Sequence, residues 1–202
     1  MKKLLVTLAI TGIAVGAFAQ GTIQFQNTGG ATKEKFIYNV DASNPTSDVL
    51  GGVRAKVEGA YSAQLFVGAA GASEADLKAI DASLTTFKSG ATAGLLNGNS
   101  KLAVPGMLGG VKVTLQLRVW DSSVASWAEV IRTANDGKAR GKSNLVLNYE
   151  LAGVDADNAP HIGSLNLANF GLSSFGLYIV PEPSVIALGA LGLGALVLRR
   201  RK

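Results

Sequence analysis

Residues 111–120 read Val-Lys-Val-Thr-Leu-Gln-Leu-Arg-Val-Trp, and this stretch decides the fold of the chain. Apolar residues occupy every second position, which is the period of a β-strand with one buried and one solvated face. The side chains expected to face the core are those of Val111, Val113, Leu115, Leu117 and Val119. The side chains expected to face solvent are those of Lys112, Thr114, Gln116, Arg118 and Trp120.

Shorter stretches with strand character lie on both sides of this one. They are residues 21–27, 35–40, 60–68, 84–87, 144–151, 164–167 and 172–180, with one weak strand inside the Gly-rich stretch 89–110. Helix signals are few: a short turn from Ser73, and a capping box formed by Ser126 and Glu129 that opens a helix to about Ala134. Many short strands with Gly-rich turns and one or two short helices predict an all-β, β-sandwich-like domain.

Composition narrows the chemistry that this domain can perform. The chain has 202 residues, no cysteine and one histidine. It therefore has no disulfide, no thiol nucleophile and no site built on two histidines. No motif indicates a catalytic nucleophile, so we expect a protein that is not an enzyme and that carries no cofactor and no metal.

The N-terminal end has the three parts of a secretory signal peptide. Met1-Lys2-Lys3 is basic, residues 4–18 are mostly apolar, and Ala17-Phe18-Ala19 precedes Gln20. This pattern predicts cleavage after Ala19, removal of residues 1–19 and export of the rest.

The net charge of +5 belongs to the two ends of the chain. Residues 20–180 hold 13 Lys plus Arg and 13 Asp plus Glu, and are therefore neutral. A neutral domain gives no support to a nucleic-acid partner.

The C-terminal end has a second three-part pattern. Val180-Pro181-Glu182-Pro183 is followed by an uncharged apolar run from Val185 to Leu198 and by the cations Arg199, Arg200, Arg201 and Lys202. The run has 14 residues, whereas a membrane crossing usually takes about 20, so a buried C-terminal helix is an alternative. Apolarity on every face and the terminal cations, which suit a headgroup layer, favour a single transmembrane helix.

This pattern resembles the PEP-CTERM sorting domain of Gram-negative bacteria over residues 180–202. The resemblance implies recognition by an exosortase, a membrane-embedded enzyme similar to a cysteine transpeptidase, which would cut near Pro181-Glu182-Pro183. Residues 20–179 would then be an ectodomain, held first at the inner membrane and then passed to the cell surface or the extracellular polysaccharide matrix. A permanently anchored single-pass protein is the alternative. Softer similarity to other PEP-CTERM ectodomains in residues 21–27, 61–68 and 113–121 implies a β-rich fold and no activity.

Two candidate binding sites remain in the ectodomain. Trp120 and Trp127 either present flat faces to the sugars of an extracellular polysaccharide or pack on each other, and the usual burial of large aromatic residues favours packing. Asp155, Asp157 and Asn158 offer oxygen ligands on one loop, but calcium takes six or more, and Asp and Asn also simply favour turns.

Overall fold

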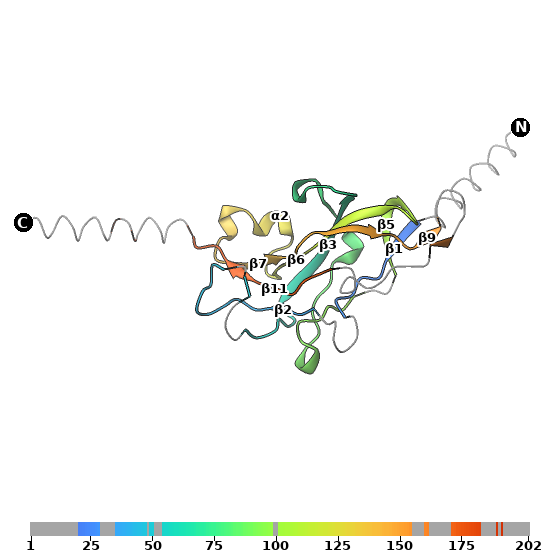
Figure 1. The fold of residues 1–202 in the computed structure, drawn as a ribbon. Coiled ribbons are helices and arrows are strands. Elements are labelled where there is room, and N and C mark those ends of the chain that lie inside the picture. The colour runs from blue at the N-terminus through green and yellow to red at the C-terminus, as the bar shows by residue number, and fades with distance from the viewer. Residues whose placement is uncertain are drawn as a thin grey trace, which may run out of the picture.

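The described part of residues 20–179, the segment expected above to be an ectodomain and called so from here on, is an all-β structure, shown in Figure 1. The computed structural model describes residues 20–28, 35–47, 49–50, 54–98, 101–154, 160–161, 171–182, 189 and 191. Strands dominate the described ectodomain, which has one short α-helix and four 3-10 turns. The all-β prediction is therefore confirmed.

A six-stranded sheet forms around β6 (Lys112–Asp121), the strand expected from the alternating stretch. β3 (Tyr61–Ala69) pairs antiparallel with β6 over nine consecutive residue pairs. β7 (Ala139–Lys142) and β8 (Val146–Glu150) pair with the other side of β6. The two-residue strands β4 (Lys78–Ala79) and β12 (Tyr178–Ile179) form the edges, giving the order β12-β7-β6-β3-β4.

Three two-stranded sheets complete the described strands. β1 (Gln20–Ile23) pairs with β5 (Leu102–Leu108), and β2 (Ile37–Tyr38) pairs in parallel with β11 (Phe175–Gly176). β9 (Gly153–Val154) pairs with β10 (Pro160–His161). The main core joins side chains of the first two pairs to one face of the large sheet, including Ile23, Ile37, Leu102, Leu115 and Leu117.

The other face of β6 is covered, so the expected wet face is wrong. Thr114, Gln116, Arg118 and Trp120 are at most 7% exposed, and only Lys112 of the set expected outside is exposed. Conversely, Val111 precedes the strand and is 42% exposed. The sheet is thus buried on both faces along most of β6.

Segments before β4 and after β6 provide this cover and bind the polar side chains under it. Gly71 N donates to Thr114 Oγ1 at 2.9 Å, and Arg118 Nη2 donates to the Glu74 carbonyl at 3.0 Å. Gln116 Nε2 donates to the Ser143 carbonyl at 3.1 Å. Buried polar groups are tolerated when they are hydrogen-bonded in this way.

The helix signals are confirmed in part. Helix α2 (Trp127–Val130) begins where the capping box predicts, with Glu129 N donating to Ser126 Oγ at 3.3 Å, but it ends well before Ala134. The 3-10 turns are η1 (Glu74–Asp76), η2 (Asp81–Ser83), η3 (Gly90–Thr92) and η4 (Thr133–Asn135). Within the stretch expected to hold one weak strand, β5 has seven residues.

The two ends of the described ectodomain lie on opposite sides of the molecule. β1, β5 and β9 lie together at one end, while β7 and β11 lie at the other (Figure 1). The predicted signal peptide, the strand expected at 164–167 and nearly all of the predicted tail lie outside the described residues. Within the described part, no helix has the length and apolarity that a membrane crossing requires.

Candidate functional site at the C-terminal end of the ectodomain

The last strand segment of the ectodomain is hydrogen-bonded on both sides. On one side, Leu177 N donates to the Tyr38 carbonyl at 2.9 Å and Ile179 N donates to the Pro45 carbonyl at 2.6 Å. On the other side, β12 pairs antiparallel with Ala139 and Arg140 of β7.

Strand pairing among the described residues stops at the edge of the predicted sorting motif. Gly137 N donates to the Val180 carbonyl at 2.7 Å, and the next residues, Pro181 and Glu182, are exposed and outside any strand. Proline has no N–H to continue a ladder, so this end of the pairing follows from the sequence. The Glu182 side chain lies close to Gly137: a Cβ built on Gly137 would be 3.4 Å from Glu182 Oε1.

The rest of the predicted sorting segment is described at two positions. Gly189 and Leu191 are helical, and Leu191 is 71% exposed. Pro183 and the basic residues Arg199, Arg200, Arg201 and Lys202 lie outside the described residues.

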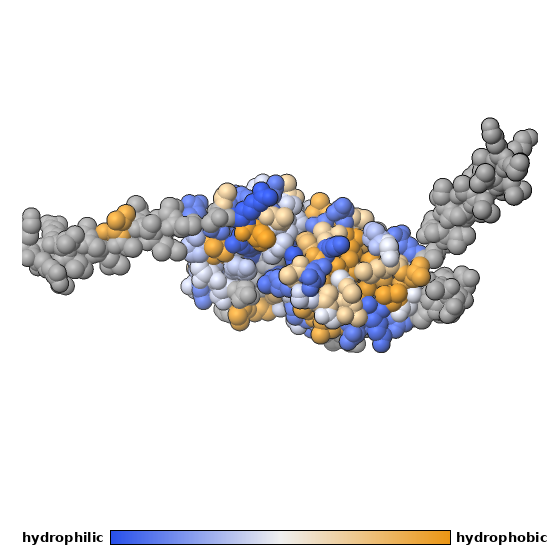
Figure 2. Space-filling view, turned by 90° about the horizontal axis from the view of Figure 1, so that it is seen from above, coloured by the Kyte–Doolittle hydropathy of each residue, from blue (hydrophilic) through white to orange (hydrophobic). Residues whose placement is uncertain are grey.

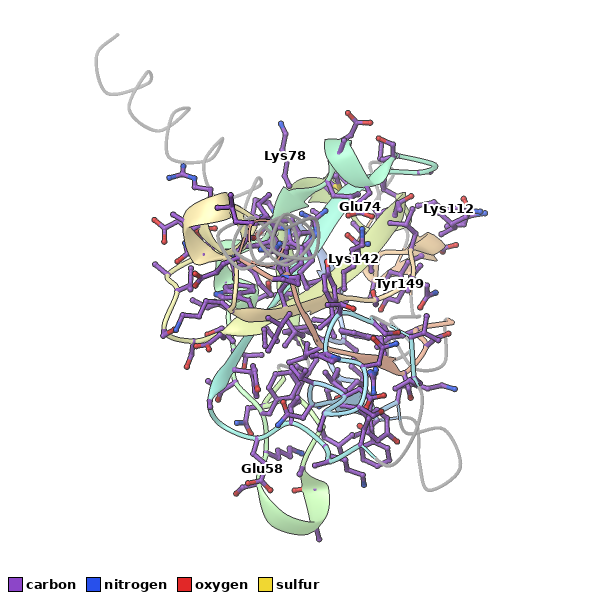
Figure 3. All side chains as sticks on the ribbon, turned by 90° about the vertical axis from the view of Figure 1, so that its left-hand side faces the viewer. Glu58, Glu74, Lys78, Lys112, Lys142 and Tyr149 are labelled. Atoms are coloured by element: carbon purple, nitrogen blue, oxygen red, sulfur yellow. The ribbon has the colours of Figure 1, made fainter. Side chains whose placement is uncertain are left out.

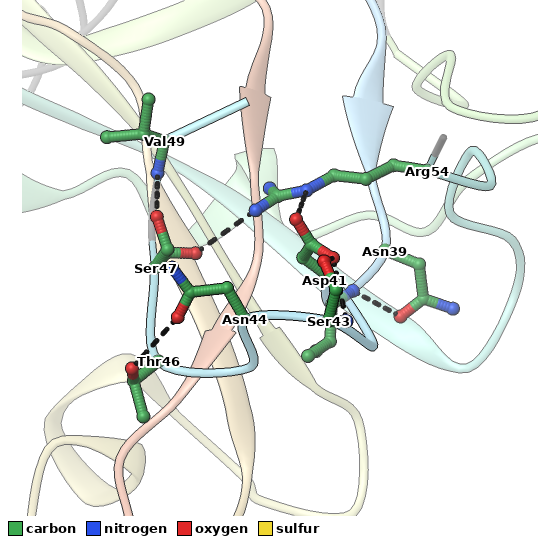
Figure 4. Close-up of polar contacts among 9 residues, drawn as sticks. Asn39, Asp41, Ser43, Asn44, Thr46, Ser47, Val49 and Arg54 are labelled. Carbon is green, nitrogen blue, oxygen red and sulfur yellow. Dashed lines mark hydrogen bonds and ion pairs between the residues drawn. The ribbon is translucent and has the colours of Figure 1, made fainter. Parts of the chain in front are cut away.

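The chain leaves the fold between Val180 and Pro181, and we call this point the exit. A loop beside the exit is held by an internal hydrogen-bond network, shown in Figure 4. We call residues 41–47 and 49–50 the exit loop. The Asp41 carboxylate accepts from Ser43 Oγ at 2.6 Å and from Ser43 N at 2.9 Å, and these bonds hold the pKa of Asp41 below its usual range. Val49 N donates to Ser47 Oγ at 3.2 Å. The loop is therefore internally hydrogen-bonded at both of its ends.

Arg54 ties the exit loop to the strand that leads to the exit. Its side chain is 2% exposed, its Nε lies 3.5 Å from Asp41 Oδ2, and its Nη2 donates to the Ser47 carbonyl at 3.3 Å (Figure 4). Its guanidinium also packs on Gly176 of β11, where any Cβ would collide with Nη1. Glycine at 176 thus leaves the space that the arginine occupies.

The exit loop carries two exposed apolar side chains, Val49 and Leu50. Val49 is 69% exposed and Leu50 is 43% exposed. Among the large apolar residues of the described ectodomain, Val49 has the highest exposed fraction. Nothing in the alternating pattern of the strands indicated these two positions, because they fall in a stretch that the sequence marks only as a turn-rich loop.

The two tryptophans pack on each other. Trp120 is 1% exposed, its ring meets that of Trp127 edge to face at 6.4 Å and 68°, and its Nε1 donates to the Val124 carbonyl at 2.9 Å. Trp120 therefore has no face free for a sugar, and the sugar-contact interpretation of that residue is wrong. Burial follows because α2 and the turn before it fold over this end of β6.

A groove of about 520 Å³ lies beside Trp127, between α2 and the β4–η2 segment. Its floor contains the buried side chains of Gln64 and Arg118, and its walls include Leu84 and Ile131, which are 54% and 53% exposed. Seen from above, hydrophobic side chains gather in patches among hydrophilic ones (Figure 2). The groove is concave and mostly apolar with a few polar groups, as ligand pockets usually are.

A charged cluster borders the covered face of the sheet. Lys142 Nζ lies 2.8 and 2.9 Å from the two carboxylate oxygens of Glu74, and Figure 3 shows the two side chains together. Burial raises the pKa of Glu74, but hydrogen bonds from Lys142 and Gln116 outweigh it, so the pKa is lowered. This cluster links η1 to β7.

The remaining predicted sites fall mostly outside the described residues. The structure does not describe Ala17, Ala19, Asp155 or Asp157, while Gln20 is the first residue of β1. Within the described part of the chain, no three His, Cys, Asp or Glu side chains gather as metal ligands would.

Comparison with known proteins identifies no relative of the chain. No family model matches the chain, and no curated protein or solved structure matches it significantly. The described residues define an all-β protein without a matched family.

Proposed function

We propose that this protein is exported and delivered to the cell surface or the extracellular matrix through the sorting segment 180–202, and that its ectodomain is not an enzyme. The observation that supports the proposal is the backbone hydrogen bond at the Val180 carbonyl, where strand pairing among the described residues ends. A processing enzyme needs accessible, extended backbone, and Pro181 and Glu182 are exposed directly after that bond.

In this proposal the tail has three separate roles. The apolar run 185–198 spans the inner membrane as a single helix, and Arg199, Arg200, Arg201 and Lys202 stay in the headgroup layer on the inner side. An exosortase-type enzyme recognises Pro181-Glu182-Pro183 and cuts near it. The ectodomain, with its sheets stacked in a sandwich-like arrangement, leaves the membrane with β12 still in place.

The intact mass of the protein from its own host tests this proposal. We expect a mass that begins at Gln20 and ends between residues 180 and 183, recovered outside the membrane fraction. Replacing Pro181, Glu182 and Pro183 by alanine should leave the full tail and abolish release. Glu58→Gln, at an exposed acidic residue in the ectodomain, is the control and should be processed normally.

A mass that runs to Lys202 and occurs only in membranes would overturn the sorting proposal. It would instead support the permanently anchored single-pass protein, because the same tail would then act only as a membrane anchor.

A second candidate role is binding of an extracellular polysaccharide in the groove beside α2. The observation that favours it is the groove itself, with Gln64 and Arg118 under its apolar walls. Ile131→Asp should abolish binding of the host polysaccharide by residues 20–182, measured by calorimetry. Leu147→Asp is a matched control, since both side chains are 53% exposed and Leu147 lies outside the groove. Absence of binding by the unmodified ectodomain would eliminate this role.

A further inference from the structure

The exit loop places the most exposed apolar side chain of the described ectodomain next to the end of the fold. Single exposed apolar residues are common and need no special explanation. Val49 and Leu50 are different because of where they are: the Pro45 carbonyl of the same loop accepts from Ile179 N at 2.6 Å, three residues before Glu182. The loop and the chain exit are therefore one structural unit.

The length of chain between this unit and the apolar run is short. Only Pro183 and Ser184 separate Glu182 from Val185. Three residue steps span at most about 11 Å when fully extended, and the polar layer on each side of a bilayer is about 5–7 Å thick. If the run at 185–198 is inserted, the exit and the loop bonded to it lie at the surface of the membrane.

The charges around the exit suit such a surface. Asp41 faces Arg54 at 3.5 Å, and Asp136 faces Arg140 at 3.4 Å, so these two acids near the exit are each paired with an arginine. Lys138 follows directly after Gly137, the residue that binds the Val180 carbonyl, and a cation there is favourable beside anionic headgroups.

We propose that Val49 and Leu50 insert into the lipid interface while the tail is in the membrane, and so hold the C-terminal end of the ectodomain flat against the bilayer. This inference rests on the proposed function, because it requires an inserted tail. After the tail is removed, two apolar side chains on one loop are too few to keep the ectodomain bound to the membrane. Cleavage therefore ends the contact between the loop and the lipid as well as the anchoring by the tail.

The loop is built for this role before it meets lipid. The buried guanidinium of Arg54 holds Asp41 and the Ser47 carbonyl, and Ser47 in turn holds Val49 N. Ordering a loop at an interface costs conformational entropy, and a loop already held by hydrogen bonds avoids most of that cost.

A fluorescent label tests the contact, and the absence of native cysteine makes the labelling site unambiguous. Val49→Cys in the chain 20–202 is labelled with a nitrobenzoxadiazole dye and reconstituted into vesicles of phosphatidylethanolamine and phosphatidylglycerol. Leu108→Cys is the matched control, because Leu108 is 37% exposed and pairs with Gln20 at the opposite end of the ectodomain. A chain ending at Glu182 keeps every described strand and serves as the control without a tail.

We expect blue-shifted emission and loss of reduction by external dithionite for the label at 49, and neither change for the label at 108. Both changes should disappear in the chain that ends at Glu182. If the protein floats with the vesicles while the label at 49 keeps its aqueous spectrum, the inference is overturned and membrane anchoring stands. If the chain 20–202 does not float with the vesicles, anchoring itself is wrong and the inference fails with it.

Discussion

Replacement of Trp120 by alanine tests whether the second face of the sheet is a packed layer. The ring is 1% exposed, meets Trp127 edge to face at 6.4 Å, and donates from Nε1 to the Val124 carbonyl at 2.9 Å. Alanine removes all three contributions at once, and the turn at Val124 and the helix α2 lose the surface on which they rest.

The size of the effect follows from these contacts. Truncating a fully buried aromatic residue to alanine costs about 3–5 kcal/mol, including the cavity that remains. The edge-to-face contact accounts for about 0.5–1.5 kcal/mol and the hydrogen bond for about 1 kcal/mol. We expect a loss of about 4 kcal/mol, out of a total stability of about 5–15 kcal/mol for a domain.

Urea unfolding of residues 20–182, followed by circular dichroism and by the fluorescence of Trp127, measures the loss. Leu147→Ala is the control, since its side chain is 53% exposed and should change stability by less than about 0.5 kcal/mol. In a double-mutant cycle, Trp120→Ala and Trp127→Ala should be non-additive by about 0.5–1.5 kcal/mol. A loss below about 1 kcal/mol for Trp120→Ala would refute the packed layer.

Four further substitutions probe other parts of the fold. Gly98→Ala should destabilise the ectodomain by about 1–3 kcal/mol in urea unfolding, because its Cβ would collide with the Phe25 carbonyl, and backbone cannot move aside as a side chain can. Ser126→Ala should cost about 1 kcal/mol by removing the side-chain cap of α2, and unchanged stability would show that the cap contributes nothing. Glu74 has a lowered pKa, so its contribution to stability is present above its ordinary value of 4.5 and is lost as pH falls through the folded-state pKa. Glu74→Gln should therefore flatten the acid limb of stability against pH, and Lys142→Met should do the same; an unchanged acid limb in both variants would contradict this role.

The strands were predictable where one face of a segment is apolar throughout. The alternation in residues 111–120 and 60–68 is a local signal, since successive side chains of a strand point to opposite faces. β7 was not predicted, because Ala139–Lys142 contains two cations and a glycine and has no apolar alternation. It is a strand because β6 and β12 offer backbone partners on its two sides.

One part of the candidate site could be predicted from the sequence and another part could not. The proline at 181 marks where the ladder ends, and the tail pattern around it is contiguous in sequence. The exit loop has no such signal, because it becomes part of the site only when Pro45 meets Ile179, 134 residues later in the chain. A turn-rich stretch of Asn, Pro, Ser and Asp predicts a loop but not which other segment that loop will meet.

The sequence by itself determined the period-2 strands, the all-β class, the neutral charge of the ectodomain and the two terminal patterns, because each depends on residues that are neighbours along the chain. Only the tertiary structure decided that Thr114, Gln116, Arg118 and Trp120 are buried. A polar side chain lies outside or inside according to whether a distant segment brings it a hydrogen-bond partner, and Gly71, Glu74 and Ser143 do so here.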